Sequence, residues 1–198
     1  MVITSASKQK GNTLIEFMIA SLVGAMALAI IGAVFLSNQK AAAQRSKEIM
    51  LLQQVSSVMQ QMKEDIQRAG FDDMGTNSLR LSGAPTVIYH ELDKFGYVYR
   101  QPAVSASNTV YRFEANKLRY CQDDTVLPLG ISDAISANCS DLFDAEQIKV
   151  TQFGIERSKL FGASVESAFI SISMATELKN DPSISHVMSL QVQQRNWQ

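Results

Sequence analysis

The stretch Gly11-Asn12-Thr13-Leu14-Ile15-Glu16-Phe17, which an apolar run continues as far as Leu36, decides the fold of this chain. From Phe17 through Gln39 the sequence holds no charged residue and no proline. About 20 predominantly apolar residues are enough for a helix to cross a bilayer, and a single span must be helical because hydrocarbon offers no water to backbone polar groups. The segment therefore predicts one helix whose transmembrane part covers about 15–37.

Two ordinary interpretations leave part of this segment unexplained. A secretory signal has an apolar core of roughly 7–15 residues with a small-residue cleavage site beyond it, and the run here is longer. A plain membrane anchor accounts for the length and for Lys8 and Lys10 upstream, but not for Glu16 inside the first turn. A carboxylate at the bilayer centre costs about 3 kcal/mol on insertion scales, and less near the interface, so an intramembrane acid indicates a function.

The hexapeptide that ends at Glu16, joined to an apolar helix, resembles the class III signal of type IV pilins and type II secretion pseudopilins. The resemblance implies that a prepilin peptidase cuts between Gly11 and Asn12 on the cytoplasmic side and methylates the new amine of Asn12. Asn12 stands where most family members have phenylalanine, and Ala33 stands near where many major pilins have a helix-kinking proline. Both departures are more typical of a minor subunit than of the bulk fibre subunit.

Cleavage changes the electrostatics around Glu16. Before the cut the nitrogen of Asn12 is an uncharged amide, and afterwards it is an amine with a pKa of about 8, largely cationic at neutral pH. The two residues stand four apart on a helix, so a contact within one chain is open, whereas the resemblance implies a contact with a neighbouring subunit's amine. Charges about 4 Å apart at an effective dielectric constant of about 20 attract by about 4 kcal/mol before desolvation is subtracted. We expect this attraction to set the register between assembled helices; the alternative is a solvated interfacial charge.

Length and charge place limits on the rest of the chain. The 198 residues leave room for one domain of ordinary size beyond the leader and the membrane helix. A net charge of −1 gives no global basic field, so nucleic acid binding is not indicated. Lys8 and Lys10 favour a cytoplasmic N-terminus, with the region after Leu36 outside. Basic residues also follow the span, so this orientation rests partly on the resemblance.

Cys121 and Cys139 are the only cysteines, and both lie beyond the span. If this region occupies an oxidising compartment such as the periplasm, the pair is expected to form a disulfide bond. Closing a loop of this size stabilises a fold by about 3 kcal/mol in the chain-entropy model. The alternative, free thiols or a redox pair, lacks a CxxC spacing and metal partners.

The helical pattern continues past the membrane segment. Apolar residues recur at spacings of three and four, and Gly70 then provides a helix stop. This stripe comprises Leu52, Val55, Met59, Met62, Ile66 and Ala69. We therefore expect one helix over about 13–69, with its second half packed against a sheet.

After Pro85 the apolar period changes to two, which is typical of strands. Strands are predicted at 87–91, 96–100, 109–113, 118–121, 148–155, 168–176 and 187–192. Between Phe113 and Leu118 we expect a hairpin whose turn uses Asn116. Loops are predicted at 72–85, with a short strand at 79–81, between the two cysteines, and at 177–185.

The fold class predicted from these patterns is α+β and pilin-like: a long N-terminal helix, membrane-spanning in its first half, packed on an antiparallel β-sheet. The expected parts are a leader peptide at 1–11, the helix at 12–70 and a periplasmic β-rich head at 71–198.

Motifs for catalysis or cofactor binding were not found in the sequence. His90 and His186 stand in no metal-spaced or triad-like setting, and no P-loop, GxSxG or HExxH occurs. Arg112 and Arg119 with nearby tyrosines are interpreted as a solvated strand face, not as a stacking surface for single strands. We predict no catalytic residue, no metal site, no cofactor and no small-molecule substrate; whether a cation is bound stays open.

Two short motifs narrow the resemblance to the PilW class of minor pilins: Arg68-Ala69-Gly70-Phe71 and the terminal Arg195-Asn196. Membership implies a subunit of the inner membrane, with other major and minor pilins, prepilin peptidase and a pilus-tip adhesin as partners, that later docks into a pilus or its tip. Taken without the resemblance, 68–71 is interpreted as a helix end whose aromatic residue, Phe71, tucks under the first turn. J-type pseudopilins share every motif used here. A membrane-anchored periplasmic binding or sensor protein is the rival from another class, and it would keep its first residues.

Overall fold

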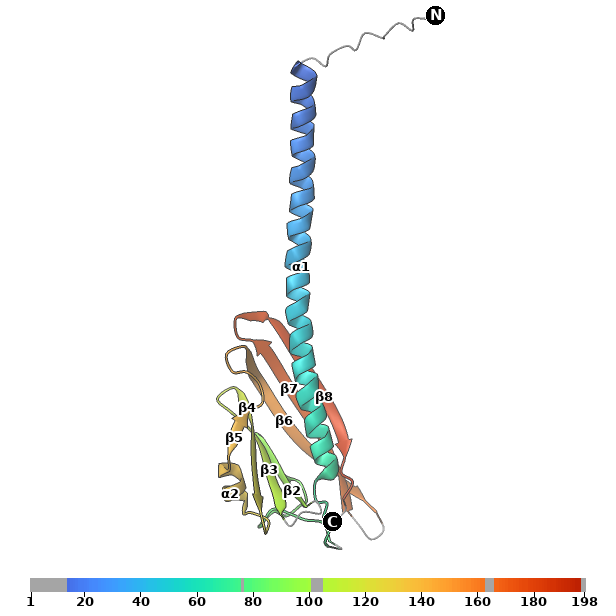
Figure 1. The fold of residues 1–198 in the computed structure, drawn as a ribbon. Helices are drawn as coiled ribbons and strands as arrows, with labels where there is room; N and C mark the ends of the chain where they lie inside the picture. Colours follow the sequence, from blue (N-terminus) through green and yellow to red (C-terminus); the bar gives the residue numbers. More distant parts are fainter. Residues whose placement is uncertain (1–13, 76, 101–104, 163–165, 197–198) are drawn as a thin grey trace, which may run out of the picture. The chain divides into compact units, whose positions relative to one another are not determined.

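The computed structural model describes residues 14–75, 77–100, 105–162 and 166–196 (Figure 1). The chain divides into two compact units, 1–46 and 47–198. Helix α1 (Leu14–Arg68) contributes its first part to the first unit and its last turns to the second. The predicted helix over about 13–69 is confirmed to within one residue of its end, and its predicted first residue lies outside the described ranges.

In the second unit, the last turns of α1 bury one apolar stripe. The buried residues are Leu51, Val55, Val58, Met59, Met62, Asp65 and Ile66. The predicted start of the stripe was wrong by one position, because Leu51 is buried whereas Leu52 is 40% exposed. At 3.6 residues per turn, Leu51 lies in line with Val55 and Met62, while Leu52 falls on the flank of the stripe.

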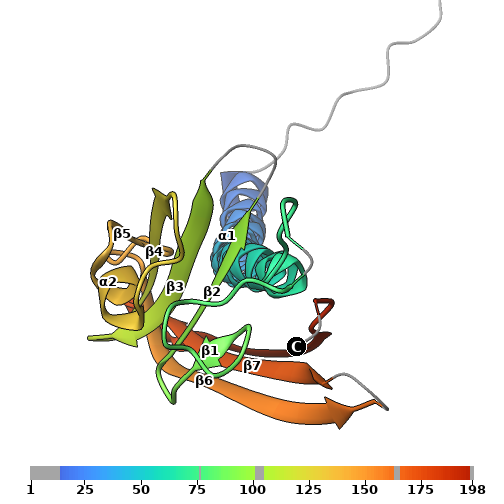
Figure 2. The same cartoon turned by 90° about the horizontal axis from the view of Figure 1, so that it is seen from below.

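The strands form two antiparallel sheets instead of the single sheet expected. The first has the order β1-β2-β3-β4-β5, with β1 (Tyr89–His90), β2 (Lys94–Arg100), β3 (Ala106–Glu114), β4 (Lys117–Thr125) and β5 (Cys139–Asp141). The second has the order β6-β7-β8, with β6 (Ile148–Phe161), β7 (Glu166–Leu178) and β8 (Asp181–Gln193). Figure 2 shows these as two layers that meet at an angle beside the last turns of α1.

The hairpin between β3 and β4 turns as predicted. Its register is continuous from Ala106↔Thr125 to Glu114↔Lys117. Ala115 and Asn116 both have positive φ, at 51° and 61°. Two successive left-handed residues are typical of a type I′ turn, whose twist matches that of the flanking strands.

Three predicted loops were partly wrong. The segment between the cysteines contains a short helix, α2 (Ile131–Ser136), which buries Ala134. β7 and β8 continue through the predicted loop at 177–185 and leave a turn at 179–180, because backbone pairing such as Glu177↔Ser185 tolerates polar side chains. At the predicted strand 79–81 the described chain forms no strand; the neighbouring Ser82 makes an isolated bridge with Gly130.

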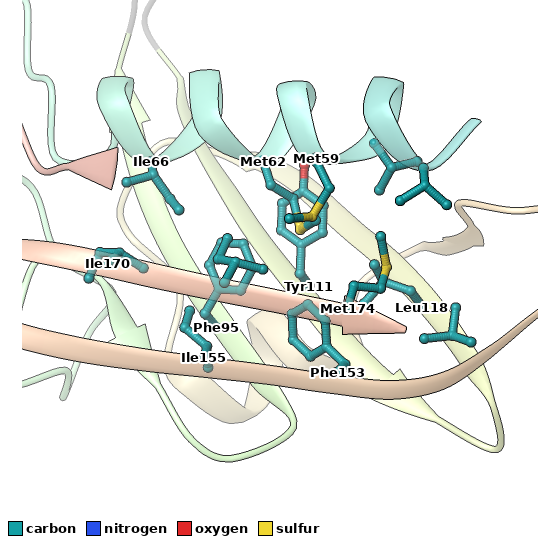
Figure 3. Close-up of a cluster of buried hydrophobic side chains, with 14 of the residues drawn as sticks. Met59, Met62, Ile66, Phe95, Tyr111, Leu118, Phe153, Ile155, Ile170 and Met174 are labelled. Atoms are coloured by element: carbon teal, nitrogen blue, oxygen red, sulfur yellow. The ribbon is translucent and has the colours of Figure 1, made fainter. Parts of the chain in front are cut away.

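Both sheets and the last turns of α1 contribute to one buried hydrophobic cluster (Figure 3). At its centre the Phe95 ring stacks on the Tyr111 ring with centroids 4.7 Å apart, and Phe153 approaches Phe95 from the second sheet. Met59 and Met62 close the cluster from the helix side. A second, smaller cluster that includes Val98, Val110 and Cys121 lies beneath α2.

Candidate assembly site

Glu16 lies in the first turn of α1 and is exposed. An acid in the first turn is favoured by the positive end of the helix dipole. The two residues predicted to flank the cleavage, Gly11 and Asn12, lie outside the described residues. Cleavage between them, methylation of Asn12 and the role of Glu16 in register therefore stay predictions.

From Phe17 through Leu36, α1 is apolar around almost its whole circumference. Every residue from 14 through 46 is exposed, and large apolar side chains such as Ile19 and Ile30 are more than half exposed. Among the described residues, α1 is the one helix long and apolar enough to cross a membrane. A helix that is hydrophobic on all sides needs lipid or other apolar helices around it.

At the other end of α1, the two short motifs 68–71 and 195–196 meet. The side-chain amide of Asn196 donates a hydrogen bond to the Ala69 carbonyl at 2.7 Å, which caps the helix C-terminus. Gly70 has φ +79°, and a Cβ at this position would lie 2.4 Å from Cγ1 of Val87. The Gly70 N–H donates to the Val98 carbonyl at 2.8 Å. The expected tucking of Phe71 was wrong: with the backbone turning at Gly70, Phe71 is 42% exposed.

A buried polar cluster beneath the helix was missed from the sequence. The Tyr111 hydroxyl donates a hydrogen bond of 2.5 Å to the fully buried carboxylate of Asp65, which also forms an ion pair with Arg68. Burial, together with the negative charge of Asp65, raises the pKa of the Tyr111 hydroxyl. The guanidinium of Arg68 also lies over the Tyr99 ring. One sequence signal could have revealed this cluster: Asp65 lies between Met62 and Ile66 on a stripe that is otherwise apolar.

Cys121 and Cys139 form the disulfide bond that the sequence predicted. They are directly paired residues of β4 and β5. The bond therefore ties the short edge strand β5 to β4 and closes the segment that contains α2.

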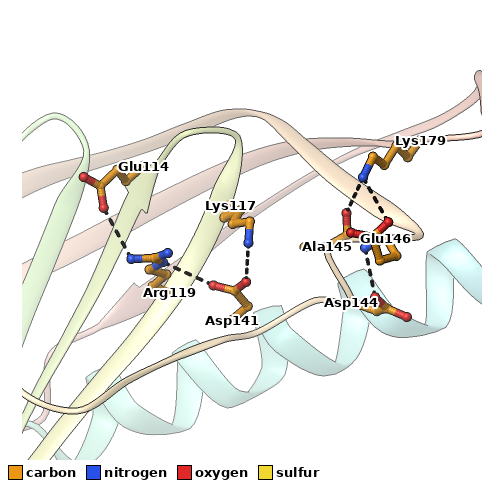
Figure 4. Close-up of polar contacts among 8 residues, drawn as sticks. All are labelled: Glu114, Lys117, Arg119, Asp141, Asp144, Ala145, Glu146 and Lys179. Atoms are coloured by element: carbon orange, nitrogen blue, oxygen red, sulfur yellow. Dashed lines mark hydrogen bonds and ion pairs between the residues drawn. The ribbon is translucent and has the colours of Figure 1, made fainter.

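Acidic partners surround the two arginines of the β3–β4 face, and Figure 4 shows those of Arg119. Arg112 and Arg119 both pair with Glu114, at 3.0 Å and 3.6 Å. Asp141 accepts from Arg119 at 3.2 Å and from Lys117 at 2.7 Å. The ammonium of Lys117, aided by Arg119, lowers the pKa of Asp141. This face is an ion-paired strand surface, whereas the sequence indicated a solvated strand face without these ion pairs.

Asp72 has structural partners of its own. Its carboxylate pairs with Arg100 at 3.5 Å and accepts the backbone N–H of Met74 at 3.2 Å. These contacts are typical of a turn residue. Within the described ranges, no group of three His, Cys, Asp or Glu residues is arranged to hold a metal ion.

Comparison with protein families finds two matches that divide the chain. The prokaryotic N-terminal methylation motif matches residues 6–32. A family described as prepilin peptidase-dependent protein B matches residues 44–194, which is well over half of the chain. The chain belongs to the prepilin peptidase-dependent protein B family. No curated protein and no solved structure matches the chain.

Membership of the prepilin peptidase-dependent protein B family, with the methylation motif, identifies a prepilin-type pilin or pseudopilin. Both matches are to pilin-like structural proteins, and they support prepilin peptidase and other pilins as partners. The α+β pilin-like arrangement predicted from the sequence is confirmed by α1 and the antiparallel strands. The apolar helix is consistent with membrane anchoring and a pilus-associated location.

Proposed function

We propose that this chain is a minor pilin of the PilW class, made as a single-span inner-membrane precursor and later docked into a pilus or its tip complex. The observation that carries the proposal is the agreement between the two family matches and the two parts of α1. The methylation motif covers most of the exposed apolar part, and the family match covers nearly all of the residues that form the folded head.

The proposed parts of the chain follow from that division. Residues 1–11 are the leader, 12–70 the helix with its transmembrane part at about 15–37, and 71–198 the periplasmic head. The leader carries Lys8 and Lys10, which favour the cytoplasmic side of the membrane. The disulfide bond supports an oxidising compartment for the head.

The proposed mechanism is assembly by charge pairing. Prepilin peptidase cuts between Gly11 and Asn12 and methylates the freed amine, which turns an uncharged amide nitrogen into a cation at neutral pH. Glu16, one turn inside the helix, then meets the amine of a neighbouring subunit. Apolar helices slide past one another at little cost, so one ion pair in a low-dielectric setting is enough to select a register.

The PilW assignment is supported by the contact between its two short motifs. The side-chain amide of Asn196 donates to the carbonyls of Arg68 and Ala69. The motif at 195–196 therefore caps the end of α1, where the motif at 68–71 lies. A J-type pseudopilin has the same motifs, and neighbouring genes for pilus assembly or for type II secretion distinguish the two.

Substituting Glu16 tests the mechanism. Glu16→Gln keeps the size of the side chain and removes its charge, and Ser21→Ala is a matched control in the same exposed helix segment. We expect both variants to be inserted and cleaved, but Glu16→Gln to reach sheared pili about tenfold less, since loss of about 1.4 kcal/mol changes an equilibrium tenfold. Immunoblots of membrane and pilus fractions measure the ratio. Normal incorporation of Glu16→Gln contradicts the proposal.

A further inference from the structure

The two sheets have four edge strands, β1, β5, β6 and β8, and these differ in how well they are protected against pairing with another chain. An edge strand presents unpaired N–H and C=O groups, which pair with another chain unless the strand is short, charged or irregular. β1 and β5 have two and three residues and offer little to pair with. β6 and β8 have 14 and 13 residues and form the two edges of the three-stranded sheet.

β6 is protected along its length, whereas β8 has such features only at its start, where Asp181 and Pro182 stand and the register shifts. β6 carries charged residues at Lys149, Glu156, Arg157 and Lys159, and its register shifts after Val150. The N–H of Val150 also donates to the Asn116 carbonyl of the β3–β4 turn. By contrast, residues 182–194 contain no charge, and the pairing of β8 with β7 is regular from Phe169↔Gln193 to Glu177↔Ser185. In the part of the chain that the structure describes, no strand pairs with the other side of β8.

The backbone groups that face the open side of β8 can be assigned. The Gln194 N–H donates to the Ala168 carbonyl, which marks this pair as a hydrogen-bonded one. Hydrogen-bonded and non-bonded pairs alternate along an antiparallel ladder. The N–H and C=O groups of the odd-numbered residues therefore point away from β7. These residues are Ser185, Val187, Ser189, Gln191 and Gln193, and the side chains of all five are exposed.

The direction of β8 restricts what can pair there. The strand begins beside the helix at Asp181, which forms an ion pair with Lys47, and Asn196 beyond its end caps Ala69. β8 therefore runs in the same direction as the last turns of α1. Two copies related by a two-fold axis would pair their β8 strands antiparallel and point their helices in opposite directions. Subunits that assemble from one membrane have their helices pointing the same way, so a two-fold β8–β8 pair does not fit such an assembly.

We propose that the open side of β8 receives an extended strand of a different pilin-type subunit, not the β8 of a second copy. This inference rests on the proposed function, since it needs a fibre or tip complex with parallel helices. The contact is a heterologous one, and it adds main-chain hydrogen bonds in the head to the register set at Glu16.

The test is photo-crosslinking of the full chain in cells that assemble the complex. A photoreactive phenylalanine analogue replaces Gln191, next to the open side, or Val126, which is 70% exposed and lies outside β8. We combine it with Ser189→Pro, which removes an outward N–H without touching the ladder to β7, and with Ser189→Thr, which keeps that N–H. Intact folding of each full-length variant in detergent is checked by its thermal unfolding midpoint.

We expect position 191 to capture a subunit that mass spectrometry identifies as pilin-type, and position 126 not to capture it. Ser189→Pro should lower the yield about tenfold, because it removes one hydrogen bond and blocks close approach of a strand, and Ser189→Thr should leave the yield unchanged. Equal yields for Ser189→Pro and Ser189→Thr overturn the inference, as does capture of only a second copy or of nothing. If processing and pilus incorporation are normal in that case, the proposed function stands and only the strand contact fails.

Discussion

The two parts of helix α1 contain similar apolar residues but arrange them differently. From Phe17 to Leu36 apolar side chains cover almost all sides of the helix, and every residue from 14 to 46 is exposed. From Lys47 to Arg68 most of them lie on one stripe, which is buried in the head, although Ile49 and Leu52 stay exposed. The distribution around the helix, more than the amount of apolar residue, therefore decides whether a segment packs on its own chain or is left for lipid and other subunits.

The largest expected effect on stability comes from comparing one methionine in each part of the helix. Met62 is fully buried and Met26 is 57% exposed. Met62→Ala should lower the free energy of unfolding of the head by about 3.5 kcal/mol, through lost burial and the cavity left behind. Met26→Ala should leave it unchanged. Denaturant unfolding of the full chain in detergent, followed by near-ultraviolet circular dichroism, compares the two, and equal destabilisation would break the contrast.

The disulfide bond should matter only to the head. Replacing both Cys121 and Cys139 with serine should lower the free energy of unfolding of the head by about 3 kcal/mol, because the closed loop no longer restricts the unfolded chain. Helical signal from the first part of α1 should persist when the head unfolds. Chemical denaturation with and without reductant measures this, and an unchanged midpoint under reduction contradicts the prediction.

Asp65, the buried acid of the second part of α1, tests whether a polar cluster also stabilises the packing of this part in the head. Asp65→Ala leaves the Tyr111 hydroxyl and the Arg68 guanidinium without their shared partner and should destabilise the head by about 2 kcal/mol. Tyr111→Phe should cost about 1 kcal/mol by the same measurement. The exposed neighbour Glu64 serves as control, and Glu64→Ala should stay within about 0.5 kcal/mol of the parent chain. Equal effects of Asp65→Ala and Glu64→Ala would show that the cluster adds nothing.

The smallest effect is expected at the helix end. Asn196→Ala removes the hydrogen bond to the Ala69 carbonyl and should lower the free energy of unfolding by about 1 kcal/mol. Arg195→Ala, at the exposed neighbouring position, is the matched control. Faster amide hydrogen exchange in the last turn of α1 should accompany the loss, and unchanged exchange in that turn would show that the cap does not hold the helix end.

The sequence was sufficient for features with a repeated or strictly local signal. The helix was predictable because its stripe recurs over many turns, and the hairpin because Asn116 tolerates the left-handed region. The disulfide followed from there being only two cysteines. Features that depend on distant partners were not predictable: Asn196 caps a residue 127 positions away. The short helix α2 has too few turns to show a period, and the division into two sheets depends on packing.

The central claim is that proteolysis creates the positive charge that Glu16 meets. The most direct test is the mass of the N-terminal peptide of the protein recovered from the membranes and pili of assembling cells. We predict a peptide that begins at Asn12 and carries a methyl group on its amine. A functional, pilus-associated protein that still begins with the Lys8- and Lys10-bearing leader would contradict the account.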